Sequence, residues 1–242
     1  MSELARLSVV IPVHNEAENV GLLAGELHAV LGSLGGGEII FVDDGSTDDT
    51  VSVLHTARAS GIPELRVICH EWHSGQSAAV CTGVRVARTE WIATLDGDGQ
   101  NDPADIAKLI AAQQREPALR LIVGNRTTRR DTWVRRVSAR VANGVRGGLL
   151  GDGTPDSGCG IKLFDRDTFM NLPRFDHMHR FLPALFQRAG AKVASVPVSH
   201  RPRIRGTSKY GLRNRLWAGI VDLCGVIWLT RRKAPPDAFH EE

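Results

Sequence analysis

The sequence has few cysteines, and their spacing excludes two common uses of this residue. Cys69, Cys81, Cys159 and Cys224 include no CxxC pair, and no secretory signal precedes them. Disulfide frameworks occur mainly in secreted proteins, and zinc sites usually show closely spaced cysteines. We therefore expect four reduced thiols in a cytoplasmic protein, with neither a disulfide nor a zinc site.

A long hydrophobic run is also missing. The most apolar stretch, LWAGIVDLCGVIWL, is about fifteen residues long and contains Asp222, so it is too short for a helix that spans a bilayer. Basic residues stand on both sides of it, and Trp217 and Trp228 fall on one face of a helix. The pattern favours an interfacial helix that docks on anionic lipid at the inner, cytoplasmic face of the cell membrane, or on an integral membrane partner. An ordinary buried helix is the alternative.

Two nucleotide-binding fingerprints are absent from the first half. The turn PVHNEAEN contains neither GxGxxG nor GxxxxGK[ST]. The glycines of these patterns let the backbone approach a pyrophosphate or triphosphate closely. NAD-dependent and P-loop chemistry are therefore not expected.

What the chain does contain is a regular alternation of apolar runs and helix-forming segments. Its 242 residues are 42% hydrophobic, which is enough for one large core. Apolar runs that begin near Leu7, Glu38, Leu65 and Trp91 are each followed by a polar turn and a helical pattern. Four such units predict an α/β fold: a Rossmann-like, mainly parallel sheet flanked by helices, with an amphipathic helical appendage at the C-terminus.

The polar turns also predict where the helices begin. Asn15 is expected to cap the first helix, and Ser46, Thr47 or Asp48 the second. Pro103 suits the first turn of the fourth helix. Ligands of such sheets bind beyond the carboxyl ends of the strands, which is where these turns lie.

Four aspartates follow the fourth predicted strand: Asp96, Asp98, Asp102 and Asp105. Asp102 and Asp105 flank Pro103 and fit an ordinary helix start. Asp96 and Asp98 are two residues apart, so their side chains point the same way and repel unless a cation lies between them. A calcium loop does not fit, because the glycine and glutamate of that pattern are missing. Mg²⁺ or Mn²⁺ fits better and predicts a phosphorylated substrate.

The ordered motifs IPVHNEAEN, VDDGSTDDT, GQSAA and DGDGQNDP resemble those of the family 2 glycosyltransferases of GT-A fold. Within that family, the chain looks most like the polyprenyl-phosphate glycosyltransferases, whose type members are dolichol-phosphate mannose and glucose synthases. The resemblance covers residues 7–209. It implies a GT-A catalytic domain over residues 1–212, followed by a membrane-associating helix and a disordered tail over residues 213–242.

The resemblance also implies a donor site with a divalent cation. In the family, the D-x-D pair binds a cation that bridges the donor diphosphate, so the implied metal-binding residues are Asp96, Asp98 and Gln100. The implied nucleotide-sugar-binding residues are Pro12, Asn15, Glu16, Asp43, Asp44 and Gln76. Asn15, Asp43 and Asp44 would also fit simple turn and cap roles. Gln76 stands where many members have Lys, so the donor sugar does not carry over.

The second half of the chain predicts an anionic partner. Acidic residues cluster before about residue 105 and arginines after about residue 125, although the net charge is only +3. By resemblance, Arg126, Arg136 and Arg140 contact donor and acceptor phosphates, for which the guanidinium fork is well suited. A solvated helix face is the alternative for this arginine run. The R-x-x-G-x-S-K pattern sets Arg205, Ser208 and Lys209 near the phosphate of the lipid.

The stretch PDSGCGIKLF resembles a further family motif, D-x-x-C-G-x-K-L-F. The resemblance sets Asp156 and Cys159 on the acceptor side. We expect Cys159 to pack rather than react, because the sequence shows no neighbouring base that would lower the pKa of its thiol.

Together these patterns predict a metal-dependent, inverting hexosyltransferase. It would move a sugar from a nucleotide-diphosphate sugar to an undecaprenyl- or dolichyl-type phosphate, with Asp96, Asp98, Arg126, Arg136 and Arg140 as the catalytic set. A lipid phosphate is already anionic at neutral pH, so no catalytic base is required. The alternatives are a soluble family 2 enzyme that acts on a glycan hydroxyl, and an inactive nucleotide-sugar-binding module. No nucleic-acid partner is expected, and a homo-oligomer stays open.

Overall fold

The computed structural model describes residues 7–126, 150–151, 153–202 and 212–232, with the backbone alone for residues 212–220. The strands are β1 (Leu7–Val13), β2 (Gly37–Asp43), β3 (Leu65–Cys69), β4 (Trp91–Thr94), β5 (Leu119–Arg126), β6 (Lys162–Asp165) and β7 (Lys192–Val198). The helices are α1 (Ala17–Ser33), α2 (Thr50–Ala59), α3 (Gln76–Val86), α4 (Ile106–Arg115), α6 (Arg166–Met170), α7 (Leu182–Arg188) and α8 (Leu212–Arg231). Two 3-10 turns are η2 (Pro103–Asp105) and η3 (Met178–Arg180).

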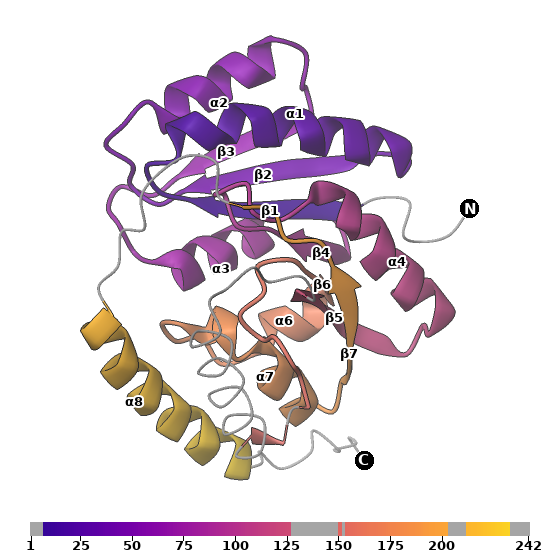
Figure 1. Ribbon diagram of the computed structural model, residues 1–242, viewed down its shortest axis with the longest axis vertical. Coiled ribbons are helices and arrows are strands. Elements are labelled where there is room, and N and C mark those ends of the chain that lie inside the picture. The colour runs from indigo at the N-terminus through magenta and orange to yellow at the C-terminus, as the bar shows by residue number, and fades with distance from the viewer. Residues whose placement is uncertain (1–6, 127–149, 152, 203–211, 233–242) are drawn as a thin grey trace, which may run out of the picture.

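The strands form one sheet in the order β3-β2-β1-β4-β6-β5-β7. β6 is antiparallel to both of its neighbours, β4 and β5, whereas the other strand pairs are parallel. Figure 1 shows α1, α2 and α4 over one face of the sheet and α3, α6 and α7 over the other. This arrangement confirms the predicted α/β fold with a mainly parallel sheet.

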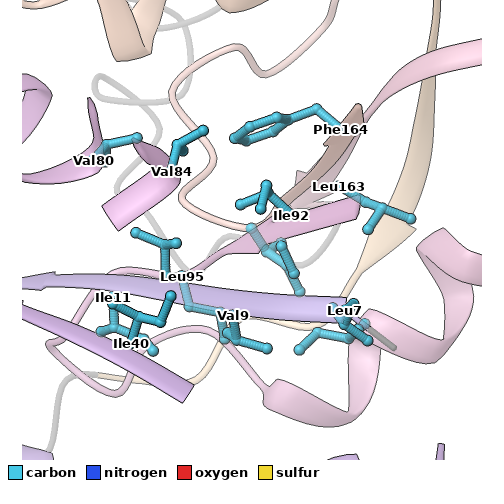
Figure 2. Packing of buried hydrophobic residues seen from close by; sticks show 14 of the residues in the cluster. Leu7, Val9, Ile11, Ile40, Val80, Val84, Ile92, Leu95, Leu163 and Phe164 are labelled. Carbon is cyan, nitrogen blue, oxygen red and sulfur yellow. The ribbon is translucent and has the colours of Figure 1, made fainter. Parts of the chain in front are cut away.

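β1 lies inside the sheet and is buried along its whole length. Figure 2 shows Val80 and Val84 of α3 above the sheet, beside Phe164 of β6. The helix approaches closely because residue 83 is glycine, and a Cβ atom there would lie 2.3 Å from Val10 Cγ1. Burial on both faces explains why β1 is apolar at every position but Ser8 rather than at alternate positions. The Ser8 hydroxyl donates to Glu38 Oε1 at 2.7 Å.

The predicted cap of the first helix is wrong. Glu16 occupies the position before α1, and its side chain makes no capping hydrogen bond; Asp48 Oδ2 instead accepts a hydrogen bond from Ala17 N at 3.3 Å. Asn15 has a left-handed backbone with φ of 53°. Its Oδ1 atom accepts hydrogen bonds from the backbone N–H groups of Thr47 (2.7 Å) and Asp48 (3.3 Å). Asn15 therefore ties the loop after β1 to the loop after β2.

The second helix also begins later than predicted. α2 starts at Thr50, and Asp49 is the residue before it. The Oδ1 atom of Asp48 accepts a hydrogen bond from Thr50 N at 3.0 Å. Ser46 and Thr47 belong to the loop instead, where the Ser46 hydroxyl accepts a hydrogen bond from Asn15 N at 2.7 Å. These side chains were expected to start a helix, and they shape the loop after β2.

α8 is the outermost helix and packs beside α7 (Figure 1). Arg188 of α7 donates from Nε to the Leu229 carbonyl and from Nη2 to the Arg232 carbonyl, both at 3.0 Å, which satisfies the end of α8. Asp222 pairs with His177 Nδ1 at 2.8 Å. Among the described helices, none combines the length and the apolar character needed to cross a membrane. The division at residues 212 and 213 stays a prediction.

Candidate active site

The predicted site residues that the structure describes gather along one edge of the sheet. Strands β1, β2, β4 and β5 all end at this edge, because they run in the same direction. The residues are Pro12, Asn15, Glu16, Asp43, Asp44, Gln76, Asp96, Asp98, Gln100 and Arg126. The other predicted phosphate contacts, Arg136, Arg140, Arg205, Ser208 and Lys209, lie outside the described residues.

Asp43 ends β2 and is buried. Its Oδ2 atom accepts a hydrogen bond from Ser46 N at 3.0 Å. Its Oδ1 atom is also buried and has no hydrogen-bond partner among the described residues. An unsatisfied buried carboxylate oxygen is costly, so this atom marks a place where a ligand N–H or O–H group would bind favourably. Beside it, Pro12 pairs with Val42 in the register of β1 and β2.

Asp44 organises the loop between β3 and α3. Both of its carboxylate oxygens accept hydrogen bonds, from the backbone N–H groups of Ser74 (2.8 Å) and Gly75 (2.7 Å) and from the His70 ring (2.8 Å). Burial alone would raise the pKa of Asp44, but these hydrogen bonds hold it below its usual value. Asp44 therefore holds the loop between β3 and α3 in place, and both of its carboxylate oxygens are already hydrogen-bonded.

Two histidines, His14 after β1 and His73 after β3, lie beside Asp44. His14 Nδ1 is hydrogen-bonded to the Asp44 carbonyl at 2.9 Å, and the ring centroids of His14 and His73 are 4.4 Å apart. Glu16, at the neighbouring turn, accepts a hydrogen bond from Asn19 Nδ2 at 2.6 Å. These contacts fix the loops that follow β1 and β2 relative to each other.

The D-x-D pair lies just beyond β4. Asp96 Oδ1 accepts a hydrogen bond from Gln76 Nε2 at 2.8 Å, and Asp98 Oδ1 accepts one from Gln100 N at 3.1 Å. Burial and the neighbouring Asp98 charge raise the pKa of Asp96, although Lys162 and other groups oppose this. Two carboxylates whose charges repel each other favour a cation bound between them. The metal-binding role of the pair stays a prediction.

The donor set at the D-x-D pair fits a hard cation. Carboxylate and amide oxygens suit Mg²⁺ and Mn²⁺. Within the described ranges, no group of three or more His, Cys, Asp and Glu side chains is placed to hold a metal ion. Asp96 and Asp98 would therefore need further oxygens from Gln100, water or a substrate diphosphate, as is usual for Mg²⁺.

Gly160 lies directly against the Asp96 side chain of the D-x-D pair. A Cβ atom on residue 160 would lie 2.2 Å from Asp96 Oδ2 and 2.7 Å from Asn101 Oδ1. Thr94 Oγ1 donates to the Gly160 carbonyl at 2.9 Å, which holds this turn against the end of β4. The turn before β6 thus fixes where the Asp96 carboxylate can lie.

A buried set of charges lies behind Asp96. Arg126 binds Asp156 through two hydrogen bonds, from Nε to Oδ2 at 2.7 Å and from Nη2 to Oδ1 at 2.8 Å. Burial would lower the pKa of Arg126, but Asp156 raises it, so the guanidinium stays charged. Asp156 thus occupies the edge of the guanidinium formed by Nε and Nη2. The predicted roles of Arg126 and Asp156 are thus linked by a direct ion pair.

Lys162 is a buried charged residue beside the candidate site, and sequence reasoning did not single it out. It is the first residue of β6, is 4% exposed, and its ammonium group donates to the Cys159 carbonyl. Burial lowers the pKa of Lys162, while Asp96 and Asp156 act in the opposite direction. A buried lysine is unusual unless it is paired. Its place in the G-x-K-L-F stretch was the signal that could have identified it.

Cys159 is fully buried, as expected for a packing residue. One argument for that expectation was wrong, because Lys162 and Arg126 are basic neighbours that favour the thiolate. Burial outweighs them and raises the pKa of the Cys159 thiol.

The two remaining aspartates have structural partners, as their position around Pro103 predicts. Asp102 Oδ1 accepts a hydrogen bond from Ala104 N at 3.0 Å, and Pro103 opens the turn η2. Asp105 is buried and pairs with Lys108 Nζ at 2.5 Å. Both residues therefore shape the chain that follows the D-x-D pair.

η3 covers the start of α3. The Ser77 hydroxyl is 2.7 Å from His179 Nδ1 and accepts a hydrogen bond from His179 N at 3.3 Å. Burial, followed by the positive charge of Lys162 and other basic neighbours, lowers the pKa of His179 to about 3. His179 is therefore a neutral imidazole at physiological pH, next to the helix that presents Gln76.

His179 gives a pH-dependent contribution to stability whose sign follows from this shift. Its pKa is about 3 in the folded protein and 6.5 ordinarily, so between these pH values the unfolded chain binds the proton more readily. Stability is therefore lost as the pH falls from 6.5 towards 3. A His179→Gln variant, which cannot titrate, should lose less stability than the parent between pH 7 and pH 5, by on the order of 1 kcal/mol. Urea unfolding at both pH values measures this difference.

The matched control is His55→Gln, at an exposed histidine of α2. It should lose stability with falling pH as the parent does. An equal pH dependence for the parent and His179→Gln would contradict the assignment.

Comparison with known proteins gives a family match. A model described as Glycosyl transferase family 2 matches residues 8–172. The chain is 36% identical over 238 residues to the dodecaprenyl-phosphate galacturonate synthase of Rhizobium johnstonii, covering 96% of this chain and 70% of that protein. It is 31% identical over 208 residues to the undecaprenyl-phosphate 4-deoxy-4-formamido-L-arabinose transferase of Edwardsiella ictaluri, covering 85% of this chain and 63% of that protein.

Solved structures share the architecture. A mannosyl-3-phosphoglycerate synthase from Rubrobacter xylanophilus superposes with a TM-score of 0.71 at 19% identity, covering 98% of this chain and 78% of that one. A glucosyl-3-phosphoglycerate synthase from Mycobacterium tuberculosis, crystallised with Mn²⁺, uridine diphosphate and phosphoglyceric acid, gives 0.71 at 21% identity, covering 98% and 82%. At this level of identity, the likeness concerns the fold alone.

Proposed function

Because the chain belongs to glycosyltransferase family 2, we propose that it transfers a sugar, with inversion, from a nucleotide-diphosphate sugar to a polyprenyl phosphate. The observation that carries the proposal is the pairing of opposite charges at one edge of the sheet. Asp96 and Asp98 offer oxygens for a divalent cation, and Arg126 stands behind them, paired with Asp156. A nucleoside diphosphate needs both kinds of group.

The two relatives named above support the acceptor. Both are sugar transferases that use polyprenyl phosphates, and the matches cover most of this chain. This chain spans 70% and 63% of their lengths, so activities of the whole relatives are carried over only as part of the proposal.

For the donor, the proposal assigns the base to the pocket at the ends of β1 and β2. The buried Oδ1 atom of Asp43 would accept a hydrogen bond from an N–H group of the nucleobase, since it has no partner among the described residues. Gln76 and Asp96 would lie towards the sugar. Pro12, Asn15, Glu16 and Asp44 would shape the pocket around the nucleotide.

In the proposed reaction, an oxygen of the lipid phosphate attacks the anomeric carbon of the sugar. The bond between that carbon and the diphosphate oxygen breaks, and the nucleoside diphosphate leaves with the bonding electrons. The attacking oxygen is already anionic, so no proton has to be removed. Arg126, and by resemblance Arg136 and Arg140, would stabilise phosphate charge, while Arg205, Ser208 and Lys209 would hold the acceptor. A Mg²⁺ or Mn²⁺ ion held by Asp96, Asp98 and Gln100 would neutralise charge on the diphosphate.

The test is a transfer assay with undecaprenyl phosphate, Mg²⁺ or Mn²⁺, and a panel of UDP- and GDP-sugars, read by mass spectrometry of the lipid. A new lipid-phosphate sugar that disappears on addition of EDTA is the expected result. Transfer to a soluble glycan instead of the lipid would favour the hydroxyl acceptor. Metal-dependent nucleotide binding without transfer to any acceptor would favour an inactive module.

We further propose that α8 docks on the cytoplasmic face of the membrane. Its outward side carries Val221 and Trp228, which are 65% and 60% exposed, and the Arg232 guanidinium lies 5.1 Å from the Trp228 ring centroid. An amphipathic ring beside a cation suits the boundary between acyl chains and anionic headgroups. Such docking would bring the site to its lipid substrate.

The docking proposal predicts that Trp228→Ala weakens binding to vesicles that contain anionic lipid. Loss of one buried aromatic side chain should lower the partition coefficient by about tenfold. Flotation with phosphatidylglycerol vesicles measures it. The control is Leu22→Ala, which removes a side chain of similar exposure (68%) from α1. Equal binding by the parent and Trp228→Ala would rule out docking through this side of α8.

A further inference from the structure

The segment that follows β7 returns to the loop that carries the D-x-D pair. In the sheet, β6 and β5 separate β7 from β4. Beyond its last residue, however, the chain leaves the edge of the sheet and runs back towards β1 and β4 (Figure 1). Ser199 N donates to Asp105 Oδ2 at 2.6 Å, and Arg201 N donates to the Gln100 carbonyl at 2.9 Å. Two backbone groups thus fasten the segment to the D-x-D loop.

The guanidinium group of Arg201 forms ion pairs with two acidic side chains. Its Nη1 atom is 2.9 and 2.8 Å from the two carboxylate oxygens of Glu26 in α1, and its Nη2 atom is 3.0 Å from Asp102 Oδ1. Burial would lower the pKa of Arg201, but these acidic partners raise it. One guanidinium therefore joins the D-x-D loop to a helix of the scaffold.

These contacts lie next to the loop that carries the D-x-D pair. Gln100 and Asp102 follow Asp98 by two and four residues, so Arg201 braces the loop that would hold the cation. Two residues after Arg201, the sequence enters the R-x-x-G-x-S-K pattern that the proposed function assigns to the acceptor phosphate. Neither ordinary turn geometry nor a helix cap requires such a link.

We propose that Arg201 is a positioning residue, which fixes the loop of Asp98 and Gln100 against α1. This proposal rests on the proposed function. Arg201 would hold the loop of the proposed metal-binding oxygens in one geometry, and small misplacements of such groups lower the reaction rate strongly.

Arginine is suited to this role because its planar fork reaches two carboxylates at once. A lysine has a single ammonium group at the end of a flexible chain, so it could satisfy Glu26 or Asp102 but not both in fixed geometry. Arg201→Lys should therefore rescue only part of what Arg201→Gln loses.

The test is calorimetric binding of UDP or GDP, whichever the parent binds, at a series of Mn²⁺ concentrations. We expect Arg201→Gln to raise the Mn²⁺ concentration for half-saturation by about tenfold, in the range typical of coupled neighbours. Asp102→Asn should have the same effect, and the double variant should be no worse than either single one.

Glu26→Gln removes the α1 arm of the same guanidinium and leaves the Asp102 arm, so it should raise the Mn²⁺ requirement by about as much as Arg201→Lys does. The matched control is Lys192→Gln, which removes the exposed ion pair with Glu116 and should keep the parent's Mn²⁺ requirement. The proposal would be overturned if Arg201→Gln kept the parent's Mn²⁺ requirement, or if Lys192→Gln lost as much as Arg201→Gln. If Arg201→Gln fails to fold, the Mn²⁺ requirements of Arg201→Lys and Asp102→Asn test the proposal instead, and unchanged requirements in both variants would overturn it. The binding readout needs no acceptor, so a wrong lipid substrate would not obscure the result.

Discussion

Replacement of Gly160 by alanine is expected to abolish sugar transfer. The added Cβ atom would lie 2.2 Å from Oδ2 and 2.4 Å from Cγ of Asp96, and these distances are too short for any real contact. The turn cannot retreat freely, because its carbonyl accepts the hydrogen bond from Thr94 Oγ1. Asp96 must therefore swing away from Gln76 and from its place beside Asp98. A displacement of about 1 Å in a catalytic group can cost a hundredfold in rate, and we expect at least that loss.

The matched control for this variant is Gly158→Ala, in the same turn. Its Cβ atom would lie 3.8 Å from Arg126 Nη2 and 3.9 Å from Asp156 Oδ1, which are ordinary contacts. Transfer rate and Mn²⁺-dependent nucleotide binding should fall for Gly160→Ala and stay near the parent values for Gly158→Ala. If Gly160→Ala folded and bound Mn²⁺ and nucleotide like the parent, the turn would not fix the place of Asp96 in the metal site.

The second large effect is expected for Asp98→Asn. The substitution keeps the size of the side chain but removes the negative charge, and an amide oxygen is a weaker partner for a divalent cation. Loss of one well-placed electrostatic group in an active site typically costs about a hundredfold to a thousandfold in rate, and we expect a loss in that range. A transfer assay across a Mn²⁺ titration separates weaker metal binding, which excess Mn²⁺ would partly restore, from a loss that it cannot restore.

Asp167→Asn is the control for the change in net charge. The Asp167 side chain is 84% exposed at the start of α6, away from the D-x-D loop. The Asp167→Asn variant should transfer sugar at the parent rate. If Asp98→Asn kept full activity at low Mn²⁺, Asp98 would not be a metal ligand.

The first half of the fold was predictable because each strand there is mostly apolar and is followed by a polar turn. The second half was not. β6 has only four residues and begins with Lys162, a residue type that is rarely buried. β7 is an edge strand whose residues are mostly part-exposed, so its pattern is weak. Nothing in the local sequence states that β6 inserts antiparallel between β4 and β5, because that choice depends on long-range pairing.

The candidate site was also only partly predictable from the sequence. The spacing of Asp96 and Asp98 identified a carboxylate pair from two residues alone. Asn15 was misread as a helix cap, because its true partners, Thr47 and Asp48, are more than thirty residues away and could not be seen locally. Lys162 was missed although it stands in the G-x-K-L-F stretch. Its burial next to Asp96 and Asp156 is visible only in the folded arrangement.

The insertion of β6 has a consequence for the order in which the chain can assemble during synthesis. β4 pairs with β1 on one side, but its other edge stays open until residues 162–165 emerge from the ribosome. β5 has no described strand partner other than β6 and β7, so it too must wait. An open strand edge is a template for wrong pairing with another chain. Truncations that end before β6 should therefore aggregate, and chaperone dependence should be greatest in this interval of translation.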